Sequence, residues 1–245
     1  MKTLLLSERF EELMVELPDK GLPDILALAI GEFGINRFAY FPTANAAQDP
    51  KPEILTNYCD PWVTRYRTQN YQLIDPAVLA GSSSFMNVDW SEFQNTPEVS
   101  KFFGEAMEFG VSPIGLTIPI RDPENRRALF SVNADINARE WPAFKKSFQA
   151  DLTYLSFLFH KHLVARRADL APVKAQLSRR ERQVLSWAAL GKTTWETACI
   201  LKLSQRTVEF YLRNCCAQLG VANKTQAVAV ALCHGLVTLL PVHSI

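Results

Sequence analysis

The stretch between residues 205 and 214, Gln-Arg-Thr-Val-Glu-Phe-Tyr-Leu-Arg-Asn, carries side chains that can hydrogen-bond the edges of nucleic-acid bases. Val208 and Leu212 recur at helical spacing, which places them on the inner face of a helix. The outer face then carries Arg206, Glu209, Arg213 and Asn214. Arginine can bind a guanine edge through two hydrogen bonds, and asparagine can bind an adenine edge in the same way. The pattern therefore predicts a helix that reads DNA bases; the alternative is a surface helix with solvated charges.

Short helices must position these side chains. Ser178 and Glu181 form the capping box of a first helix, and the turn Lys202-Leu-Ser204 separates a second helix from a third. Helices are expected at Arg179 to Leu190, Gln205 to Leu219 and Lys224 to His234, with Gly191, Gly220 and Gly235 as the stops. Between the first two, Thr193 or Thr194 is expected to cap a short helix that reaches about Leu201. Two helices joined by such a turn predict a helix-turn-helix module. Near it, Lys192, Thr193 and Thr207 are better suited to phosphates than to bases.

The charge of the chain is divided between its two parts. From Lys174 to the C-terminus there are nine Lys and Arg against three acids, a net charge of +6, whereas the remainder carries −5. Pro172 opposes the continuation of a helix, so a boundary is expected between residues 164 and 173. A small basic domain after a larger acidic one favours a polyanion as the partner of the C-terminal part.

The sequence shows few of the residue patterns that enzymes use for catalysis. His160 and His162 lie two residues apart on a predicted helix, so they cannot bind one metal and are expected at the surface. Cys215 and Cys216 likewise point to different faces, and Cys59 has no histidine or acid placed to activate it. The sequence has neither a glycine-rich phosphate loop nor a serine-nucleophile elbow. We expect a protein that is not an enzyme and has no metal or cofactor.

The N-terminal part mixes helix and strand patterns. Helices are expected at residues 10–17, 22–33, 61–68, 97–109 and 141–163, and strands at 37–41, 116–121 and 127–134. Thr96 is expected to cap the helix that follows it, and Asp122-Pro-Glu-Asn125 to make a turn. Helices flanking an antiparallel sheet predict an α-β-α sandwich, so the chain is expected to be α+β with an all-α C-terminal domain.

The composition is that of a globular protein with two modest domains, since 48% of the 245 residues are hydrophobic and 21% are charged. No apolar run reaches the roughly 18 residues of a membrane-spanning helix, and the N-terminus lacks the pattern of a signal peptide. Five cysteines without paired spacing favour reduced thiols. We therefore expect a cytoplasmic protein without membrane contact.

The C-terminal sequence resembles the DNA-binding signature of LuxR-type transcription regulators. The resemblance lies in LSRRERQVLSWAALGKT from Leu177 and LSQRTV from Leu203, with the hallmark Glu, Leu and Gly of the family at Glu181, Leu185 and Gly191. Gln218-Leu-Gly-Val221 resembles the Lys-Leu-Gly-Val of the family. The chain differs at Thr197, Glu209 and Tyr211, where the family usually has isoleucine and often has a basic residue and a histidine. The expected DNA contacts are Lys192, Thr193, Thr194, Gln205, Arg206, Thr207, Glu209, Phe210, Arg213 and Asn214.

The N-terminal sequence resembles the ligand pocket of the members that bind N-acyl-homoserine lactones. The matching positions are Tyr58, Trp62, Tyr66, Asp75-Pro76, Trp90 and Gly115. Such a ligand has a lactone carbonyl, an amide N–H and an amide carbonyl, and burying each without a partner costs about 1–3 kcal/mol. The pocket must therefore supply complementary groups.

The resemblance implies a role for each pocket side chain. Trp62 would donate to the lactone carbonyl, Asp75 would accept from the amide N–H, and Tyr58 would donate to the amide carbonyl. Tyr66 and Trp90 would wall the ring and the start of the acyl chain, and Ser131 would add a hydroxyl. The alternatives are core packing for each aromatic and an ordinary turn or cap for Asp75.

Together these observations identify the chain as a member of the quorum-sensing regulators. Residues 1–164 are expected to form the sensor and dimerisation domain, 165–173 a linker and 174–245 the DNA-binding domain. The expected partners are an autoinducer lactone, a second copy of the chain through the helix 141–163, promoter DNA and RNA polymerase. Two alternatives remain: a regulator of the same family that responds to another small molecule or to none, and a lactone-acting enzyme with a DNA-binding tail.

Overall fold

The computed structural model describes residues 5–43, 54–123, 126–166 and 177–237. The chain divides into two compact units, Met1–Arg121 with Arg127–Ala168, and Asp122–Arg126 with Asp169–Ile245. Across the described ranges, none of the helices combines the length and the apolar character needed to span a membrane.

A five-stranded antiparallel sheet forms the centre of the first unit. Its strands are β1 (Arg37–Pro42), β2 (Leu55–Thr56), β3 (Val88–Asp89), β4 (Gly115–Arg121) and β5 (Arg127–Asn133). The strand order is β2-β1-β5-β4-β3, with Phe130 of β5 opposite both Tyr40 of β1 and Ile118 of β4. Because successive side chains of a strand point to opposite faces, each strand contributes to both sides of the sheet.

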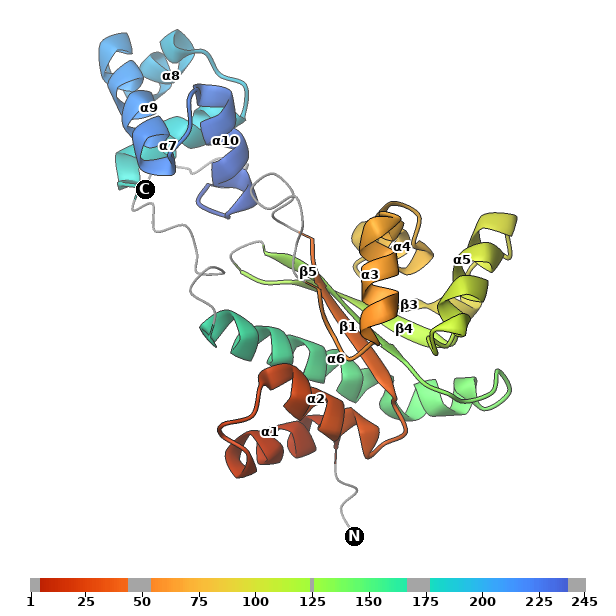
Figure 1. The fold of residues 1–245 in the computed structure, drawn as a ribbon. Coiled ribbons are helices and arrows are strands. Elements are labelled where there is room, and N and C mark those ends of the chain that lie inside the picture. The colour runs from red at the N-terminus through yellow and green to blue at the C-terminus, as the bar shows by residue number, and fades with distance from the viewer. Residues whose placement is uncertain (1–4, 44–53, 124–125, 167–176, 238–245) are drawn as a thin grey trace. The chain divides into compact units, whose positions relative to one another are not determined.

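Helices cover both faces of this sheet (Figure 1). On one side lie α1 (Leu6–Glu16), α2 (Leu22–Gly31) and α6 (Trp141–Arg166), and on the other lie α3 (Asp60–Thr68), α4 (Pro76–Ser83) and α5 (Pro97–Glu108). The fully buried ring of Phe159 on α6 packs against those of Phe38 on β1 and Phe130 on β5, and the three ring centroids lie 6.0 to 6.4 Å apart. The α-β-α sandwich predicted from the sequence is confirmed.

Most element bounds agree with the predicted ranges to within a few residues. Thr96 caps α5 as expected, its hydroxyl accepting from the amide of Val99. The prediction missed α4 and the two short strands β2 and β3. Helix α6 continues to Arg166, into the segment expected as a linker, and residues 167–173 of that segment lie outside the described residues. Residues 124 and 125 of the expected turn also lie outside them.

The expectation that His160 lies at the surface was wrong. Its side chain is buried on α6, and its Nδ1 lies 2.7 Å from the hydroxyl oxygen of Tyr40 on β1. His162, half-buried, makes an edge contact with the ring of Phe10. A histidine can be buried when a hydrogen-bond partner accompanies it, and here a distant strand supplies that partner.

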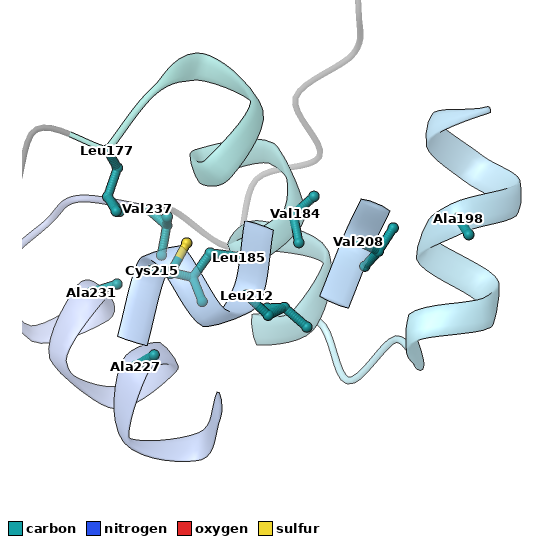
Figure 2. Close-up of a cluster of buried hydrophobic side chains, with 10 residues drawn as sticks. All are labelled: Leu177, Val184, Leu185, Ala198, Val208, Leu212, Cys215, Ala227, Ala231 and Val237. Carbon is teal, nitrogen blue, oxygen red and sulfur yellow. The ribbon is translucent and has the colours of Figure 1, made fainter. Parts of the chain in front are cut away.

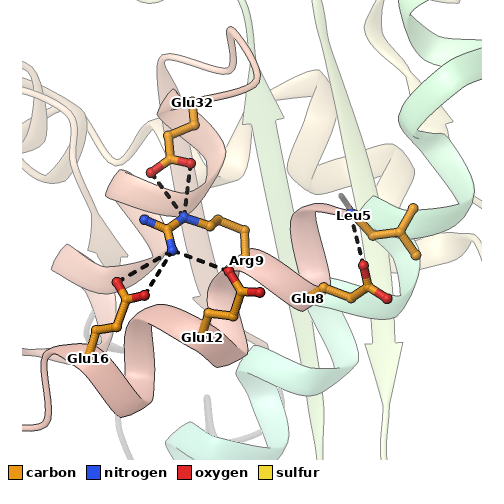
Figure 3. Close-up of polar contacts among 6 residues, drawn as sticks. All are labelled: Leu5, Glu8, Arg9, Glu12, Glu16 and Glu32. Carbon is orange, nitrogen blue, oxygen red and sulfur yellow. Dashed lines mark hydrogen bonds and ion pairs between the residues drawn. The ribbon is translucent and has the colours of Figure 1, made fainter. Parts of the chain in front are cut away.

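The outer surface of α1 carries a network of ion pairs centred on Arg9 (Figure 3). The guanidinium group donates to Glu32 at the end of α2 and to Glu12 and Glu16 on α1. These acids are exposed, so the network contributes little to stability. Its pair with Glu32 connects α1 to the residue that follows α2.

The second unit consists of α7 (Arg179–Ala189), α8 (Thr194–Leu201), α9 (Gln205–Leu219) and α10 (Lys224–Cys233). Side chains of all four helices meet in one apolar cluster (Figure 2), made of Leu177, Val184, Leu185, Ala198, Val208, Leu212, Cys215, Ala227, Ala231 and Val237. Gly191 and Gly220 follow α7 and α9 with φ of +80° and +65°, a backbone conformation that favours glycine. The predicted helix-turn-helix arrangement is present.

Candidate functional site

A pocket lies between the sheet and helices α3 and α4 of the first unit. Its lining residues are Ala39, Phe41, Ile54, Thr56, Tyr58, Trp62, Val63, Tyr66, Asp75, Val78, Trp90, Leu129 and Ser131. Six of these were singled out from the sequence: Tyr58, Trp62, Tyr66, Asp75, Trp90 and Ser131. The fold thus brings together residues that are up to 73 positions apart, from Tyr58 to Ser131.

Helix α3 contributes two aromatic rings from one face. Trp62 and Tyr66 are four residues apart, which makes them neighbours on a helix, and their ring centroids lie 6.0 Å apart in an edge-on arrangement. Trp62 is only 2% exposed, yet no acceptor for its indole N–H is found in the part of the chain that the structure describes. Trp62 is one of the residues that line the pocket. The indole is therefore available to a carbonyl oxygen in the pocket.

Asp75 supplies an acceptor. It caps α4 through Oδ1, which accepts from the amide of Ala77 at 2.8 Å, and its Oδ2 accepts from the hydroxyl of Tyr66 at 2.9 Å. Pro76 occupies the first helical position, where its missing N–H is harmless. Burial raises the pKa of Asp75 to about 6, partly opposed by the hydrogen bonds from Tyr66 and the α4 backbone. The carboxyl group is thus held in one orientation at the pocket wall, where Asp75 caps α4.

Tyr58 presents a hydroxyl from the segment before α3. Its oxygen accepts a hydrogen bond from Nδ2 of Asn133, 2.8 Å away on β5. Burial, followed by the nearby charge of Asp75, raises the pKa of Tyr58, so the phenol keeps its proton at neutral pH. The hydroxyl can therefore donate to a group in the pocket.

Trp90 closes the pocket on the side of β4. Its indole N–H donates to Oγ1 of Thr117 at 2.8 Å, and that hydroxyl lies 2.8 Å from Oγ of Ser131. A Cβ atom at Gly115 would lie 2.7 Å from the Trp90 ring, so the glycine provides the space in which the ring packs on the strand. Gly115 and Pro76 support the site without lining it.

Two polar residues of this site, Thr117 and Asn133, were not predicted. Both are buried and lie on neighbouring strands, Thr117 opposite Ser131 and Asn133 opposite Gly115. A signal existed: Thr117 stands between Leu116 and Ile118, and Ser131 and Asn133 alternate with apolar Phe130 and Val132, so Asn133 shares a strand face with Ser131.

In the second unit, the residues that match the family hallmark are structural. Glu181 is 5% exposed, and its carboxylate accepts from the amide of Ser178 at 2.7 Å and from Nε2 of Gln218 at 3.1 Å. Burial raises its pKa, but hydrogen bonds from Ser178, Gln218 and Asn214 outweigh burial and lower it overall. Glu181 therefore joins α7 to α9, next to the fully buried Leu185.

Helix α9 exposes the predicted outer side chains with one difference. Arg206, Phe210 and Arg213 are exposed, and half-buried Glu209 lies 3.4 Å from Nε2 of Gln205. Asn214 was expected on the same outer face; it is half-buried and hydrogen-bonds Glu181. Since α7 covers this side of α9, Asn214 points less outward than the helical pattern suggested.

The residues at the start of α8 are engaged with one another. Thr193 caps the helix in a capping box with Glu196, and Nζ of Lys192 lies 3.3 Å from the same carboxylate. The hydroxyl of Thr194 lies 3.4 Å from Nε2 of Gln205, across the turn between the two helices. The hydroxyl of Thr207 lies 2.7 Å from that of Ser204, the cap of α9.

Comparison with known proteins gives matches to both units. The autoinducer binding domain family matches residues 20–163, and the luxR family of bacterial regulatory proteins matches residues 175–231. The quorum-sensing regulator RhlR of Pseudomonas aeruginosa is 34% identical over 222 residues, which cover 89% of this chain and 90% of RhlR. The transcriptional activator RaiR of Rhizobium etli is 30% identical over 233 residues, which cover 90% of this chain and 94% of RaiR.

Among solved structures, Escherichia coli SdiA has a similar fold, with a TM-score of 0.66 and 22% identity over 94% of this chain and 98% of SdiA. CepR2 of Burkholderia cenocepacia, an N-acylhomoserine lactone-dependent factor, aligns with a TM-score of 0.51 and 20% identity over 64% of this chain and 94% of CepR2.

Proposed function

Because this chain belongs to the LuxR family and is a quorum-sensing transcription regulator rather than an enzyme, we propose that it binds an N-acyl-homoserine lactone and, as a dimer, promoter DNA. The proposal assigns residues 1–164 to sensing and dimerisation, 165–173 to a linker and 174–245 to DNA binding. One observation carries the ligand assignment: the indole donor of Trp62 and the oriented carboxyl acceptor of Asp75 line one pocket.

The polar groups of the pocket are complementary to those of the lactone. Trp62 donates to the lactone carbonyl, Asp75 accepts from the amide N–H, and Tyr58 donates to the acyl carbonyl. Tyr66 and Trp90 bound the ring and the first part of the chain, and the hydroxyl of Ser131 adds a polar contact. The ligand would thereby supply an acceptor for the indole N–H, which has none among the described residues.

Names of relatives support the same ligand class. CepR2 is described as dependent on an N-acylhomoserine lactone, whereas SdiA has a structure in complex with octanoyl-rac-glycerol. A test of the proposal therefore needs a monoacylglycerol beside the lactones.

The exposed side of α9 is proposed to enter the major groove. Arg206 and Arg213 read base edges, Phe210 provides an apolar contact, and the other proposed contacts are Lys192, Thr193, Thr194, Gln205, Thr207, Glu209 and Asn214. Support comes from the exposure of both arginines and from the net charge of +6 after residue 173.

Dimerisation is proposed to use α6. Tyr154 and Phe157 on this helix, the longest described, are 59% and 41% exposed, which leaves apolar surface that a second copy could cover. Two copies joined there would present two DNA-binding units to the half-sites of a near-palindromic operator.

The experiment is mass spectrometry of the small molecule that co-purifies with the protein. Cells are supplied with N-acyl-homoserine lactones from butanoyl to dodecanoyl and with octanoyl glycerol. We expect one lactone in stoichiometric amount from the unaltered protein and loss of it from Asp75→Asn. Recovery of octanoyl glycerol alone, or of no small molecule from any culture, would contradict the proposal.

A further inference from the structure

We propose that Asn133 is a positioning residue that fixes the Tyr58 hydroxyl as a hydrogen-bond donor and so selects ligands with a carbonyl acceptor at that point. The inference rests on the proposed lactone binding and deepens it. Its basis is the contact between Asn133 on β5 and Tyr58 at the pocket wall.

The amide of Asn133 is deeply buried. The residue is 1% exposed at the end of β5, where it lies opposite Arg37 of β1 and Gly115 of β4. From there its Nδ2 reaches the oxygen of Tyr58 at 2.8 Å. Neighbouring strands on both sides hold the backbone of Asn133, so the position of its amide group is set by the sheet.

This contact determines what the tyrosine hydroxyl can do. A phenol has one proton to donate, and its oxygen here accepts from Asn133. No acceptor for the Tyr58 proton is found among the described residues, and burial together with Asp75 raises the pKa of Tyr58, so the proton is retained. With its oxygen already accepting, the hydroxyl offers its proton to the pocket.

The opposite orientation of the Asn133 amide would remove this donor. With Oδ1 toward Tyr58, the hydroxyl would donate to Asn133 and present only lone pairs to the ligand. In the observed orientation, Oδ1 of Asn133 is the one buried side-chain nitrogen or oxygen of the described residues without a hydrogen-bond partner. Reversal would put the amide N–H groups there instead, and a buried carbonyl oxygen without a partner is better tolerated than a buried N–H. A ligand carbonyl favours the same orientation, because it needs a donor.

The test combines two substitutions at Asn133 with one at Tyr58. Asn133→Asp keeps the shape but provides a carboxylate that captures the tyrosine proton, and Asn133→Leu keeps the volume but leaves the hydroxyl free to rotate. Lactone affinity is measured by calorimetry at about pH 7.5, with the tightest binder of the butanoyl-to-dodecanoyl series. We expect a loss of about tenfold or more for Asn133→Asp and a smaller loss for Asn133→Leu. In a Tyr58→Phe background both substitutions should have no further effect.

A spectroscopic measurement distinguishes this role from a structural one. The same lactone, labelled with ¹³C at the acyl carbonyl, reports its hydrogen bond through its infrared stretching frequency when bound. We expect that frequency to rise both in Asn133→Asp and in Tyr58→Phe. If Asn133→Asp does not fold, the Leu variant and its Tyr58→Phe double mutant still provide the comparison.

Two failures remain distinct. An unaltered protein that binds none of the lactones would refute the proposed function. A protein that binds a lactone, but whose carbonyl frequency is the same with Asn133→Asp, or whose loss of affinity persists in the Tyr58→Phe background, would refute the role of Asn133 alone.

Discussion

Acidification should weaken lactone binding through Asp75. Burial raises the pKa of this carboxyl group to about 6, and hydrogen bonds from Tyr66 and the amide of Ala77 only partly oppose that rise. The ionised carboxylate is a much stronger acceptor for the amide N–H of a lactone than the neutral acid. Tyr58 and Tyr66, which lie nearest to it, have raised pKa values and do not titrate below about pH 8. The titration of the pocket in this range therefore belongs to Asp75.

The size of the effect follows from this pKa. With a value of about 6, roughly nine tenths of the apo protein has an ionised Asp75 at about pH 7 and roughly one tenth at about pH 5. If only the ionised form binds, the Kd rises about tenfold between these values, or about 1.4 kcal/mol. The stability of the apo protein changes in the other direction. Because the folded-state pKa lies above the ordinary 3.8, the folded state takes up the proton first, and this group favours folding as the pH falls from about 7 to about 4.

Calorimetry across this pH range, with Asp75→Asn and a matched control, tests the reasoning. Asp75→Asn places an amide donor where an acceptor is needed, so affinity at about pH 7 should fall at least about tenfold and then vary little with pH. Asp60→Asn, at an exposed acid on α3, should behave as the unaltered protein does. A Kd of the unaltered protein that is the same at about pH 5 and pH 7 would show that the charge of Asp75 does not contribute. Equal affinity of Asp75→Asn would remove the residue from the site.

Three further predictions concern the pocket walls and the DNA contacts. Trp62→Phe keeps the aromatic bulk and loses the N–H. Lactone at a hundred times the Kd of the unaltered protein should stabilise that protein by about 2.7 kcal/mol and, at the same concentration, should raise the Tm of Trp62→Phe by less; an equal rise would refute indole donation. Gly115→Ala puts a Cβ 2.7 Å from the Trp90 ring, so urea unfolding should report a loss of about 1–3 kcal/mol, and an unchanged midpoint would contradict the crowding. Arg213→Ala should lower operator affinity by about 1–3 kcal/mol and relax the base preference at one position per half-site. Lys192→Ala should instead weaken binding to all DNA sequences alike and reduce the salt dependence of binding by about one ion per subunit. If Arg213→Ala weakened binding to every site of a randomised library equally, Arg213 would be a phosphate contact.

Local signals in the sequence predicted the helices well. Thr96 and Ser178 each accept from the backbone three residues later, and such caps can be recognised without knowledge of the rest of the fold. The two-residue strands β2 and β3 lack such a signal, because periodicity needs more residues than they have. Helix α4 was missed although Asp75-Pro76 has the form of a cap followed by a first-turn proline, since a cap was considered for Asp75 only as the alternative to its role in the site, and no helix was assigned after it.

The polar partners within the core depended on contacts between distant elements. His160 is buried because Tyr40, 120 residues earlier, lies next to its Nδ1. Asn133 contacts Tyr58 across 75 residues, and Trp90 finds Thr117 across 27. A single sequence shows which residues can hydrogen-bond but not which pairs the sheet register brings together. Resemblance to a family supplied the aromatic and acidic residues of the pocket, and the residues that orient them became visible only in the fold.

The outward face of α9 carries two arginines and one acid, Glu209, and this acid affects which DNA groups the helix is expected to contact. Glu209 could have held one of the two arginines, yet in the described structure it lies near Gln205, and neither Arg206 nor Arg213 forms an ion pair with it. Both guanidinium groups thus remain available, while an acid between them reduces the attraction of the helix for phosphates in general. A carboxylate can still accept from the amino group of cytosine. On the proposed function, the acid therefore shifts the binding energy of α9 from backbone contacts, which are independent of sequence, toward contacts with base edges.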